Sequence, residues 1–355
     1  MDKKNTFAGI DTHKAPRKIG QNIIILIALV FLVAVFFALN PHFIDKYNIV
    51  SMAQSLAPYA IMSLGVTFVI ATGGIDLSIG TVCIASAVVA GKMYTSGLLG
   101  QNLWLTIPIM IAIGALFGVI NGLLIAKLKM PAFIATLGTM MISRGLSALI
   151  VSDPNIFFPS GTWFNKTFSN ANGIPTGIFW ITGFTLICMY IMYKNKTGRY
   201  ILSIGSNEEA TRLSGINTDK YKIIAYTFAG LGAGIAAIFW ASSFPTVAAA
   251  TGNGMELDAI AGVYIGGTSA AGGVASVTGS VIGAALLVVI RNGLNMILAK
   301  FSLNLNSTYV TYVLTGIIVV VAVLMDVIKT KKQSRIKTDK KTNRKNNSST
   351  PSQAV

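Results

Sequence analysis

One acidic residue stands isolated in a long uncharged part of the chain, within the stretch ATGGIDLSIG at 71–80. Residues 53–75 carry no charge, residues 77–91 carry none either, and Asp76 lies between them. A carboxylate at the centre of a membrane helix costs about 2.5–3.5 kcal/mol. Asp76 should therefore face a helix end, the protein interior or water.

The residues around this acid indicate a break between two helices. Gly73 and Gly74 precede Asp76, and glycine is a poor helix former. Freed backbone groups are tolerated at membrane depth only away from lipid. We expect a new helix to start near Ser78 with Asp76 as its cap, and a role for Asp76 in a transport pathway or gate is the alternative.

A second acidic pair allows the same two interpretations. Glu256 and Asp258 precede an uncharged run of 32 residues, 259–290, which contains Gly266 and Gly267. Interrupted segments mark the translocation path in many transporters. Acidic residues are also favoured in an exposed first turn of a helix.

The residue types needed for covalent or metal chemistry are scarce. The sequence has no GxxxxGK[ST] phosphate-binding loop. His13 and His42 are its two histidines, both near the start, and Cys83 and Cys188 lie in separate apolar segments. We therefore expect no metal, no cofactor, no disulfide framework and no enzymatic activity. If the chain transports a solute, the energy source should be on another chain.

The composition indicates a membrane protein. Of the 355 residues, 53% are hydrophobic and 11% are charged, whereas about 25% charged residues are usual in soluble domains. Several uncharged stretches reach the length of about 20 residues that a membrane helix needs. We expect an all-α polytopic membrane protein of about ten transmembrane helices. The predicted spans are 22–39, 53–72, 78–96, 103–126, 132–151, 176–193, 223–243, 258–271, 276–298 and 309–327.

The distribution of charge predicts the orientation. The net charge of +16 is concentrated at the two ends, and basic segments stay in the cytosol. Lys127, Lys129 and the loop 194–222 should also be cytosolic, and the loop 152–175 should lie outside. Both termini are then cytosolic, in a multi-pass protein of the bacterial inner or plasma membrane, and nucleic-acid binding is not expected.

This orientation divides the chain into three parts. Residues 1–21 form a basic cytosolic segment, 22–327 form a single transmembrane domain, and 328–355 form a basic tail that is poor in apolar residues and should be disordered. The apolar run 22–39 is long and is not followed by a small-residue cleavage site, so we expect an anchor that is retained.

Glycines recur four residues apart in several spans. This spacing lets helix backbones approach closely in lipid, and we expect it to serve packing. The glycines at this spacing are Gly114, Gly118 and Gly122, then Gly230 and Gly234, Gly262 and Gly266, and Gly279 and Gly283.

The loop 194–222 contains SNEEATRLSGI, which predicts a short helix. Ser206 or Asn207 can cap its start, two glutamates occupy the first turn where the helix dipole favours acids, and Gly215 ends it. Ala210 and Leu213 form a small apolar face. The segment suits a docking helix, and a solvated turn is the alternative.

The chain resembles the permease subunits of ribose-type and other simple-sugar ABC importers, a family that includes autoinducer and branched-chain amino-acid permeases. The resemblance covers about 48–327. It rests on five stretches: ATGGIDLSIG (71–80), FIATLGTMMISRGLS (133–147), TGRYILSIGSNEEATRLSGI (197–216), ELDAIAGVYIGGTSAAGG (256–273) and RNGLNMI (291–297).

The resemblance implies a type II ABC importer-like bundle in which the short loop helix is the coupling helix that docks into a cleft of the ATPase. Its implied contact set is Asn207, Glu208, Glu209, Ala210, Arg212, Leu213, Gly215 and Ile216. The implied partners are ABC ATPase subunits, a second permease copy or related partner, an extracytoplasmic sugar-binding protein and the lipid membrane.

The resemblance further implies import of a ribose-like pentose or a hexose. The approach to ELDAIA, SSFPTVAAATGNGM, departs from the family pattern and leaves the solute open. An ABC permease for a nucleoside, an autoinducer or inositol is one alternative. An ion-coupled secondary transporter, with Asp76 as its ion site, is the other.

Overall fold

The computed structural model describes residues 18–150, 155–244 and 246–301, and then 309–310, 313–317, 320–321, 324 and 328. Residues 1–17 of the predicted basic segment 1–21, and residues 329–355 of the predicted tail 328–355, therefore lie outside the described residues. The elements, in chain order, are α1 (Lys18–Leu39), η1 (Pro41–Ile44), α2 (Lys46–Ala71), α3 (Ile79–Thr95), η2 (Leu103–Leu105), α4 (Thr106–Ala126), α5 (Ala132–Ile150), β1 (Asn155–Phe157), α6 (Trp163–Phe168), α7 (Gly177–Met189), η3 (Tyr190–Lys194), α8 (Lys196–Ser206), α9 (Glu208–Leu213), α10 (Thr218–Ser243), β2 (Thr246–Ala248), η4 (Ala249–Gly252), α11 (Met255–Ile265) and α12 (Val277–Lys300).

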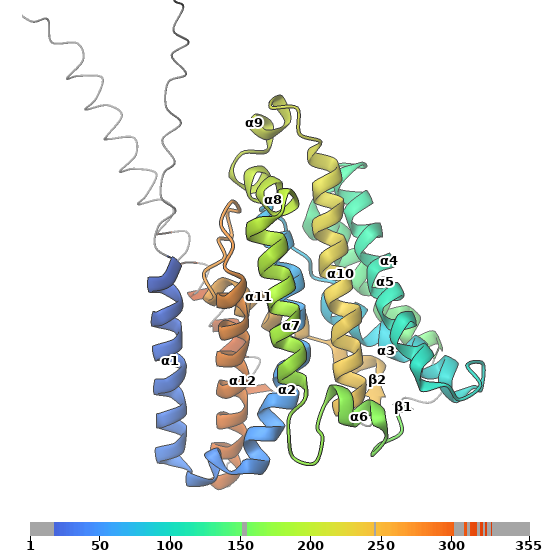
Figure 1. Cartoon of the computed structure of the whole chain (residues 1–355), viewed down its shortest axis with the longest axis vertical. Helices are drawn as coiled ribbons and strands as arrows, with labels where there is room; N and C mark the ends of the chain where they lie inside the picture. Colours follow the sequence, from blue (N-terminus) through green and yellow to red (C-terminus); the bar gives the residue numbers. More distant parts are fainter. Residues whose placement is uncertain are drawn as a thin grey trace, which may run out of the picture.

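The long helices form one bundle with α2 and α10 at its centre (Figure 1). Helix α10 packs against α2, α3 and α4, and α2 also packs against α7, α11 and α12. Helix α1 lies at the edge and contacts α12. Helices α8 and α9 lie at one end of the bundle, which we call the α9 end.

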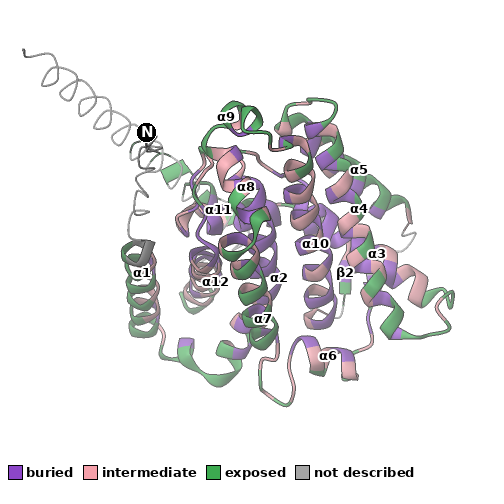
Figure 2. Ribbon diagram, turned by 45° about the horizontal axis from the view of Figure 1, so that its top comes forward, coloured by how far each residue is buried: buried purple, intermediate pink, exposed green. Residues whose placement is uncertain are grey.

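Burial follows this arrangement (Figure 2). In the most apolar window of α2, 83% of the residues are buried, compared with 11% in α1. Helix α1 is also the most hydrophobic of the candidate spans, with a mean hydropathy of 3.1. An apolar helix that exposes most of its surface requires lipid around it, which agrees with the predicted membrane class.

Seven helices of the described chain are long and apolar enough to cross a membrane. They correspond to the predicted spans 22–39, 53–72, 103–126, 132–151, 176–193, 223–243 and 276–298. The expected all-α polytopic class is therefore confirmed for the described residues.

The other three predicted spans have different outcomes, so the total of ten is not confirmed. The span 78–96 is α3, an apolar helix of 17 residues. The span 258–271 is wrong as a complete crossing, because α11 has 11 residues. At 1.5 Å per residue such a helix covers roughly half of a hydrocarbon core of about 30 Å. The span 309–327 is described only in pieces, with nine of its 19 residues outside the described ones, and it stays a prediction.

A small antiparallel sheet was not predicted. Strand β1 pairs with β2 in the register Asn155↔Ala248, Ile156↔Val247 and Phe157↔Thr246. Ile156 and Val247 are buried, and Gly91 of α3 packs against the side chain of Ile156. The pairing supplies backbone hydrogen bonds to the segment that leads from α10 to the short helix α11.

The predicted role of the regularly spaced glycines in packing is confirmed. Helices α4 and α10 cross backbone to backbone: a Cβ on Gly114 would lie 2.3 Å from the carbonyl oxygen of Gly230, and one on Gly118 would lie 2.5 Å from that of Tyr226. Gly262 and Gly283 make the same close approach between α11 and α12. Since any side chain here would meet backbone, neither pair of helices could pack this closely without glycine.

We expect Gly230→Ala to lower the free energy of unfolding by about 1–3 kcal/mol, the usual effect of overpacking. The added Cβ would lie 2.2 Å from the carbonyl oxygen of Gly114, which cannot move aside as a flexible side chain could. Thermal unfolding in detergent measures the effect. Gly183→Ala is the matched control because nothing lies within 4 Å of its Cβ position. Equal midpoints for the two variants would contradict the close helix crossing.

Candidate functional site

The short helix α9 forms as the sequence predicts. The Asn207 side chain accepts a hydrogen bond of 2.9 Å from the backbone N–H of Ala210, so Asn207, rather than Ser206, is the cap. Gly215 has φ +81°, and the N–H groups of Gly215 and Ile216 donate to the carbonyls of Arg212 and Thr211. This is a Schellman motif, which satisfies the last carbonyls of the helix.

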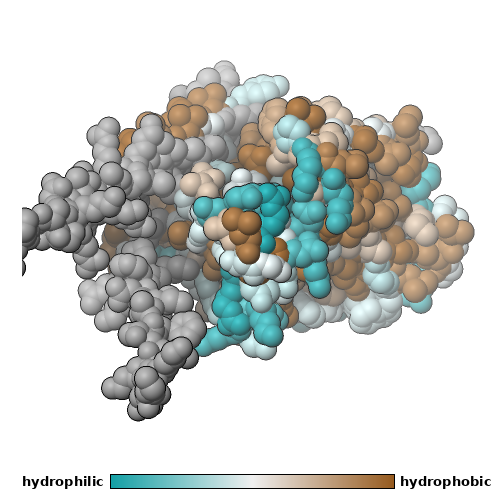
Figure 3. Space-filling model, turned by 90° about the horizontal axis from the view of Figure 1, so that it is seen from above, coloured by the Kyte–Doolittle hydropathy of each residue, from teal (hydrophilic) through white to brown (hydrophobic). Residues whose placement is uncertain are grey.

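Helix α9 presents an apolar residue to its surroundings at the α9 end. The Leu213 side chain is 80% exposed, and Ala210 is exposed beside it. Seen from this end, hydrophilic side chains gather around a small hydrophobic group (Figure 3). An exposed leucine within a polar rim is a surface that a partner can cover.

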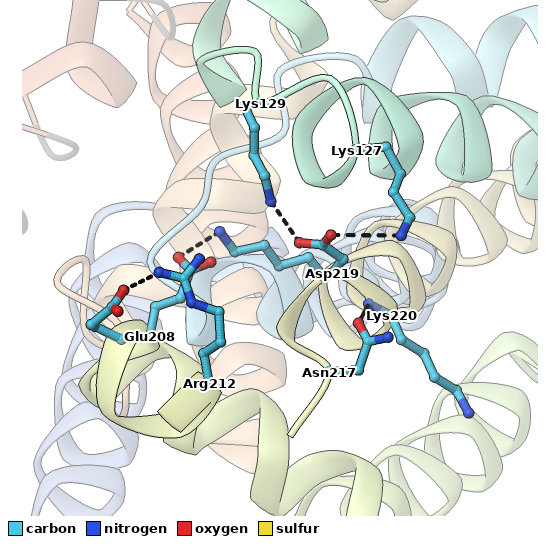
Figure 4. A network of polar contacts seen from close by, with 9 residues as sticks. Lys127, Lys129, Glu208, Arg212, Asn217, Asp219 and Lys220 are labelled. Atoms are coloured by element: carbon cyan, nitrogen blue, oxygen red, sulfur yellow. Dashed lines mark hydrogen bonds and ion pairs between the residues drawn. The ribbon is translucent and has the colours of Figure 1, made fainter. Parts of the chain in front are cut away.

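Ion pairs fix the base of α9 (Figure 4). Lys222 of α10 lies 2.6 Å from Glu208. Arg212 pairs with Glu209 within α9. Of the two glutamates in the predicted contact set, Glu208 therefore holds α9 onto α10, whereas the Glu209–Arg212 pair is the exposed one.

The adjoining turn between α4 and α5 is bound to α10 by a second group of charges. Lys129 lies 2.6 Å from Asp219, and Lys127 lies 3.6 Å from the other carboxylate oxygen, as Figure 4 shows. The two lysines indicate orientation in the sequence, but their partner Asp219 was not predicted. The signal was present, because Asn217 caps α10 and acids are favoured in a first turn.

The predicted helix break lies between the end of α2 at Ala71 and the start of α3 at Ile79. Gly73 ends α2 in a second Schellman motif, with φ +80° and N–H groups of Gly73 and Gly74 bonded to the carbonyls of Ile70 and Val69. Gly74 also leaves room for the hydroxyl of Tyr226, which would lie 2.5 Å from a Cβ there.

The expected capping by Asp76 is wrong in its position. The N-cap of α3 is Ser78, which makes no side-chain capping bond. Asp76 lies two residues earlier and accepts from the backbone N–H of Ser78 at 2.9 Å and from its hydroxyl at 2.7 Å. Because a short acidic side chain bonds most easily to the amide two residues on, Asp76 forms a turn that leads into the helix.

Asp76 is buried and belongs to a polar chain between helices. Asn121 of α4 donates to the Ser78 hydroxyl at 2.9 Å and accepts from Thr139 of α5 at 2.7 Å. Tyr226 of α10 donates to the carbonyl of Ile75. The break therefore lies within protein, where its freed backbone groups find partners.

The acids at the start of α11 are buried, so the exposed first turn considered for them is wrong. Glu256 is 7% exposed and Asp258 is 6% exposed. Asp258 forms an ion pair with Arg291 of α12, which also donates to the Tyr59 hydroxyl at 2.6 Å. Thr315 donates to the second oxygen of Asp258.

Glu256 lies beside α3, the helix that follows the break. Its Oε1 accepts from the N–H of Gly254, and its Oε2 has no hydrogen-bond partner among the described residues. A Cβ on Gly80 would lie 2.5 Å from that Oε2. The structure thus brings the two acid-bearing stretches of the sequence into contact at Gly80 and Glu256.

Gly266 and Gly267 end α11 in the third Schellman motif of this kind. Gly267 has φ +90°, and its N–H and that of Thr268 bond to the carbonyls of Tyr264 and Val263. A Cβ on Gly266 would lie 2.3 Å from the Gly279 backbone. Both glycines are thus required by the turn and by the packing of α11 on α12.

Fold and site together define a multi-pass membrane protein with a capped helix at one end and buried polar contacts inside its bundle. Among the described residues, no group of three or more His, Cys, Asp or Glu side chains could hold a metal ion. No solved structure matches the chain.

Comparison with known sequences gives the family. The family model described as "Branched-chain amino acid transport system / permease component" matches residues 48–323. The ribose import permease protein RbsC of Escherichia coli (strain K12) is 37% identical over 308 residues, 85% of this chain and 92% of that protein. RbsC of Bacillus subtilis (strain 168) is 37% identical over 304 residues, 84% and 91%. The L-arabinose transport system permease protein AraH of Escherichia coli (strain K12) is 31% identical over 309 residues, 87% and 90%.

The chain therefore belongs to this permease family, and it is a transport component rather than an enzyme.

The buried ion pair yields a prediction about stability. We expect Asp258→Asn and Arg291→Gln each to lower the free energy of unfolding by about 3–5 kcal/mol, because each leaves one charge without its partner. The double variant should be more stable than the sum of the two losses implies. Thermal unfolding in detergent measures this double-mutant cycle.

The pair Glu209–Arg212 provides the control for this cycle, because its side chains are 62% and 57% exposed. Glu209→Gln and Arg212→Gln should leave the midpoint nearly unchanged, since exposed pairs contribute little. Strictly additive losses at Asp258 and Arg291 would show that the two side chains do not stabilise one another.

Proposed function

We propose that this chain is the transmembrane permease subunit of an ABC importer that moves a simple sugar, a ribose-like pentose or a hexose, into the cytoplasm. The supporting observation is its 37% identity, over 85% of its length, to a protein named for ribose import. A relative named for L-arabinose transport supports the wider class of simple sugars. Separate ATPase subunits hydrolyse the ATP.

We infer that α9 is the surface on which an ATPase subunit docks. Leu213 is exposed, both ends of α9 are capped, and the pair Glu208–Lys222 holds the helix to α10. These features suit a rigid helix that docks into a cleft. The proposed contact set is Asn207, Glu208, Glu209, Ala210, Arg212, Leu213, Gly215 and Ile216. Within it, Glu208 positions the helix through Lys222, while Glu209, Arg212 and Leu213 meet the partner.

The remaining partners follow from this assignment. A second copy of the chain, or a related permease, completes the pathway, and an extracytoplasmic binding protein delivers the sugar. The α9 end faces the cytosol, since Lys127 and Lys129 pair with Asp219 in the first turn of α10, which follows α9, and short basic loops stay inside. Both termini are then cytosolic, and the domain 22–327 lies in the bacterial inner or plasma membrane.

The break and the start of α11 border the proposed pathway. Interrupted helices of this kind occur at translocation paths. The residues concerned are Gly73, Gly74, Asp76, Ser78, Glu256, Asp258, Gly266 and Gly267. Asp76 and Asp258 are hydrogen-bonded within the bundle, so we assign them to shaping the pathway rather than to holding the solute.

Co-purification with candidate ATPase subunits tests the docking helix. We expect Leu213→Asp to weaken the association by about 2 kcal/mol or more, roughly 30-fold in affinity, because it places a charge at the centre of the contact. The double variant Glu209→Ala/Arg212→Ala should weaken it as well. Leu98→Asp is the matched control: Leu98 is also exposed, at 72%, and precedes α4 at the end opposite Lys127.

The solute is then the sugar that stimulates ATP hydrolysis by the assembled complex, with ribose and L-arabinose tested first. Stimulation by a nucleoside, an autoinducer or inositol would replace the sugar while keeping the importer class. If no ATPase ever associates with the folded chain, the importer assignment is wrong, and ion-dependent uptake by an Asp76→Asn variant becomes the next measurement.

A further inference from the structure

Three backbone segments that are distant in the sequence touch one another at the α9 end. A Cβ on Gly205 of α8 would lie 2.0 Å from the carbonyl oxygen of Ala71 and 2.3 Å from the N–H nitrogen of Gly273. A Cβ on Gly272 would lie 2.7 Å from the nitrogen of Gly73 and 2.9 Å from the Cα of Gly205. We call these five residues the glycine junction. It joins the end of α8, the end of α2 and the loop 266–276.

The first arm of the glycine junction is connected rigidly to α9. Asn207 is both the C-cap of α8 and the N-cap of α9. The hydroxyls of Ser203 and Thr211 lie 2.8 Å apart, which joins the two helices across their bend, and Thr211 is buried. A displacement of α9 must therefore move the last turn of α8, which carries Gly205.

The second arm, the loop 266–276, is also stiff. Its own backbone closes through a bond of 3.1 Å from the Ser269 N–H to the Val274 carbonyl. The Tyr193 hydroxyl donates to the Ala275 carbonyl at 3.1 Å and accepts from the Val277 N–H at 3.0 Å. A loop held at several points transmits a displacement instead of absorbing it.

The third arm is the break between α2 and α3. The Gly273 N–H donates to the Ala71 carbonyl at 3.0 Å, which satisfies the last residue of α2. The break continues through Gly73 to Asp76, and so into the polar chain between α3, α4 and α5. Moving the glycine junction therefore moves the entry of α3.

On the other side of the break the packing is open. A cavity of about 390 Å³ is lined by break residues, among them Thr72 and Gly74, and by Glu208, Arg212 and Lys222. The break thus has backbone contact towards α8 and free space towards α9. This arrangement allows a push from α8 to shift the break without first compressing other atoms.

We propose that the glycine junction transmits the displacement of α9 to the α2–α3 break, and that Gly205, Gly272 and Gly273 are positioning residues for coupled transport. This inference rests on the proposed docking of an ATPase on α9. It extends that proposal by naming the contact through which the docked helix acts on the membrane interior. Glycine is required because the contact joins backbone to backbone. The displacement is then not absorbed by flexible side chains between the segments.

Cysteine labelling in the complex with the ATPase tests the proposal. The Thr72→Cys variant places a thiol at the partly exposed end of α2, and Cys83 and Cys188 are buried and should not react. With the natural glycine junction, ATP should change the labelling rate by a hydrophilic maleimide about fivefold or more, the lower end of usual coupling energies. Adding Gly205→Ala should abolish that change while the ATPase remains bound. Adding Gly183→Ala should leave it intact.

A purely structural role for Gly205 gives a different result. It would lower the yield of folded complex but leave the response to ATP unchanged in the complex that forms. If Gly205→Ala prevents folding, Gly273→Ala replaces it: its Cβ would meet the movable hydroxyl of Ser206, at 2.4 Å, and its cost is the left-handed φ of +75° rather than a clash with backbone.

The outcomes separate the two proposals. Failure of the ATPase to bind the unsubstituted chain overturns the proposed function and, with it, this inference. Binding without any effect of ATP on labelling at position 72, or with the same effect in the glycine variants, overturns the inference and leaves the importer assignment standing.

Discussion

A helix that ends inside a membrane bundle must find hydrogen-bond partners for its backbone within the protein, because lipid offers none. This constraint organises the centre of the chain. At the end of α2, the Ala71 carbonyl accepts from Gly273, the Ile75 carbonyl accepts from Tyr226, and the Ser78 amide donates to Asp76. Each partner comes from a different part of the sequence or from the turn itself. The break, the loop 266–276 and α10 therefore hold one another in place.

Close approach of backbones is what makes these partners available. Helix α10 reaches Ile75 with Tyr226 because its glycines allow it to lie directly against α4 and α2. Gly272 and Gly273 bring the loop 266–276 to Ala71 in the same way. In lipid, hydrophobic burial does not drive helices together, and packing with hydrogen bonding takes its place. The small residues and the buried polar contacts therefore hold the bundle together jointly, and neither would be sufficient alone.

The sequence predicted the local features and failed on those that depend on distant contacts. The helix break, a cap at Ser206 or Asn207 and the end at Gly215 depend on neighbouring residues; they were correct, and the structure selects Asn207 as the cap. The cap at Asp76 was placed two residues too early in the chain, because Asp76 bonds to Ser78 in a turn before α3, and that turn is held by Asn121 of α4, 43 residues further on than Ser78. Likewise, Asp258 gave no sign that its partner would be Arg291, 33 residues further on. Charge identified the membrane class, but it did not show where α11 ends, because the uncharged run 259–290 continues from α11 into α12.

The hydrogen-bond and ion-pair partners of the buried acids indicate how transport is driven. An ion-coupled transporter needs a carboxylate that an ion or proton can occupy during the cycle. Asp76 is committed to the turn before α3, and Asp258 is paired with Arg291 and bonded to Thr315. Glu256 retains one oxygen without a partner among the described residues, but that oxygen lies against Gly80. The buried acids of the described chain therefore serve as structural anchors, and the glycine junction is the contact through which, in our proposal, work done by an ATPase outside the membrane reaches its interior.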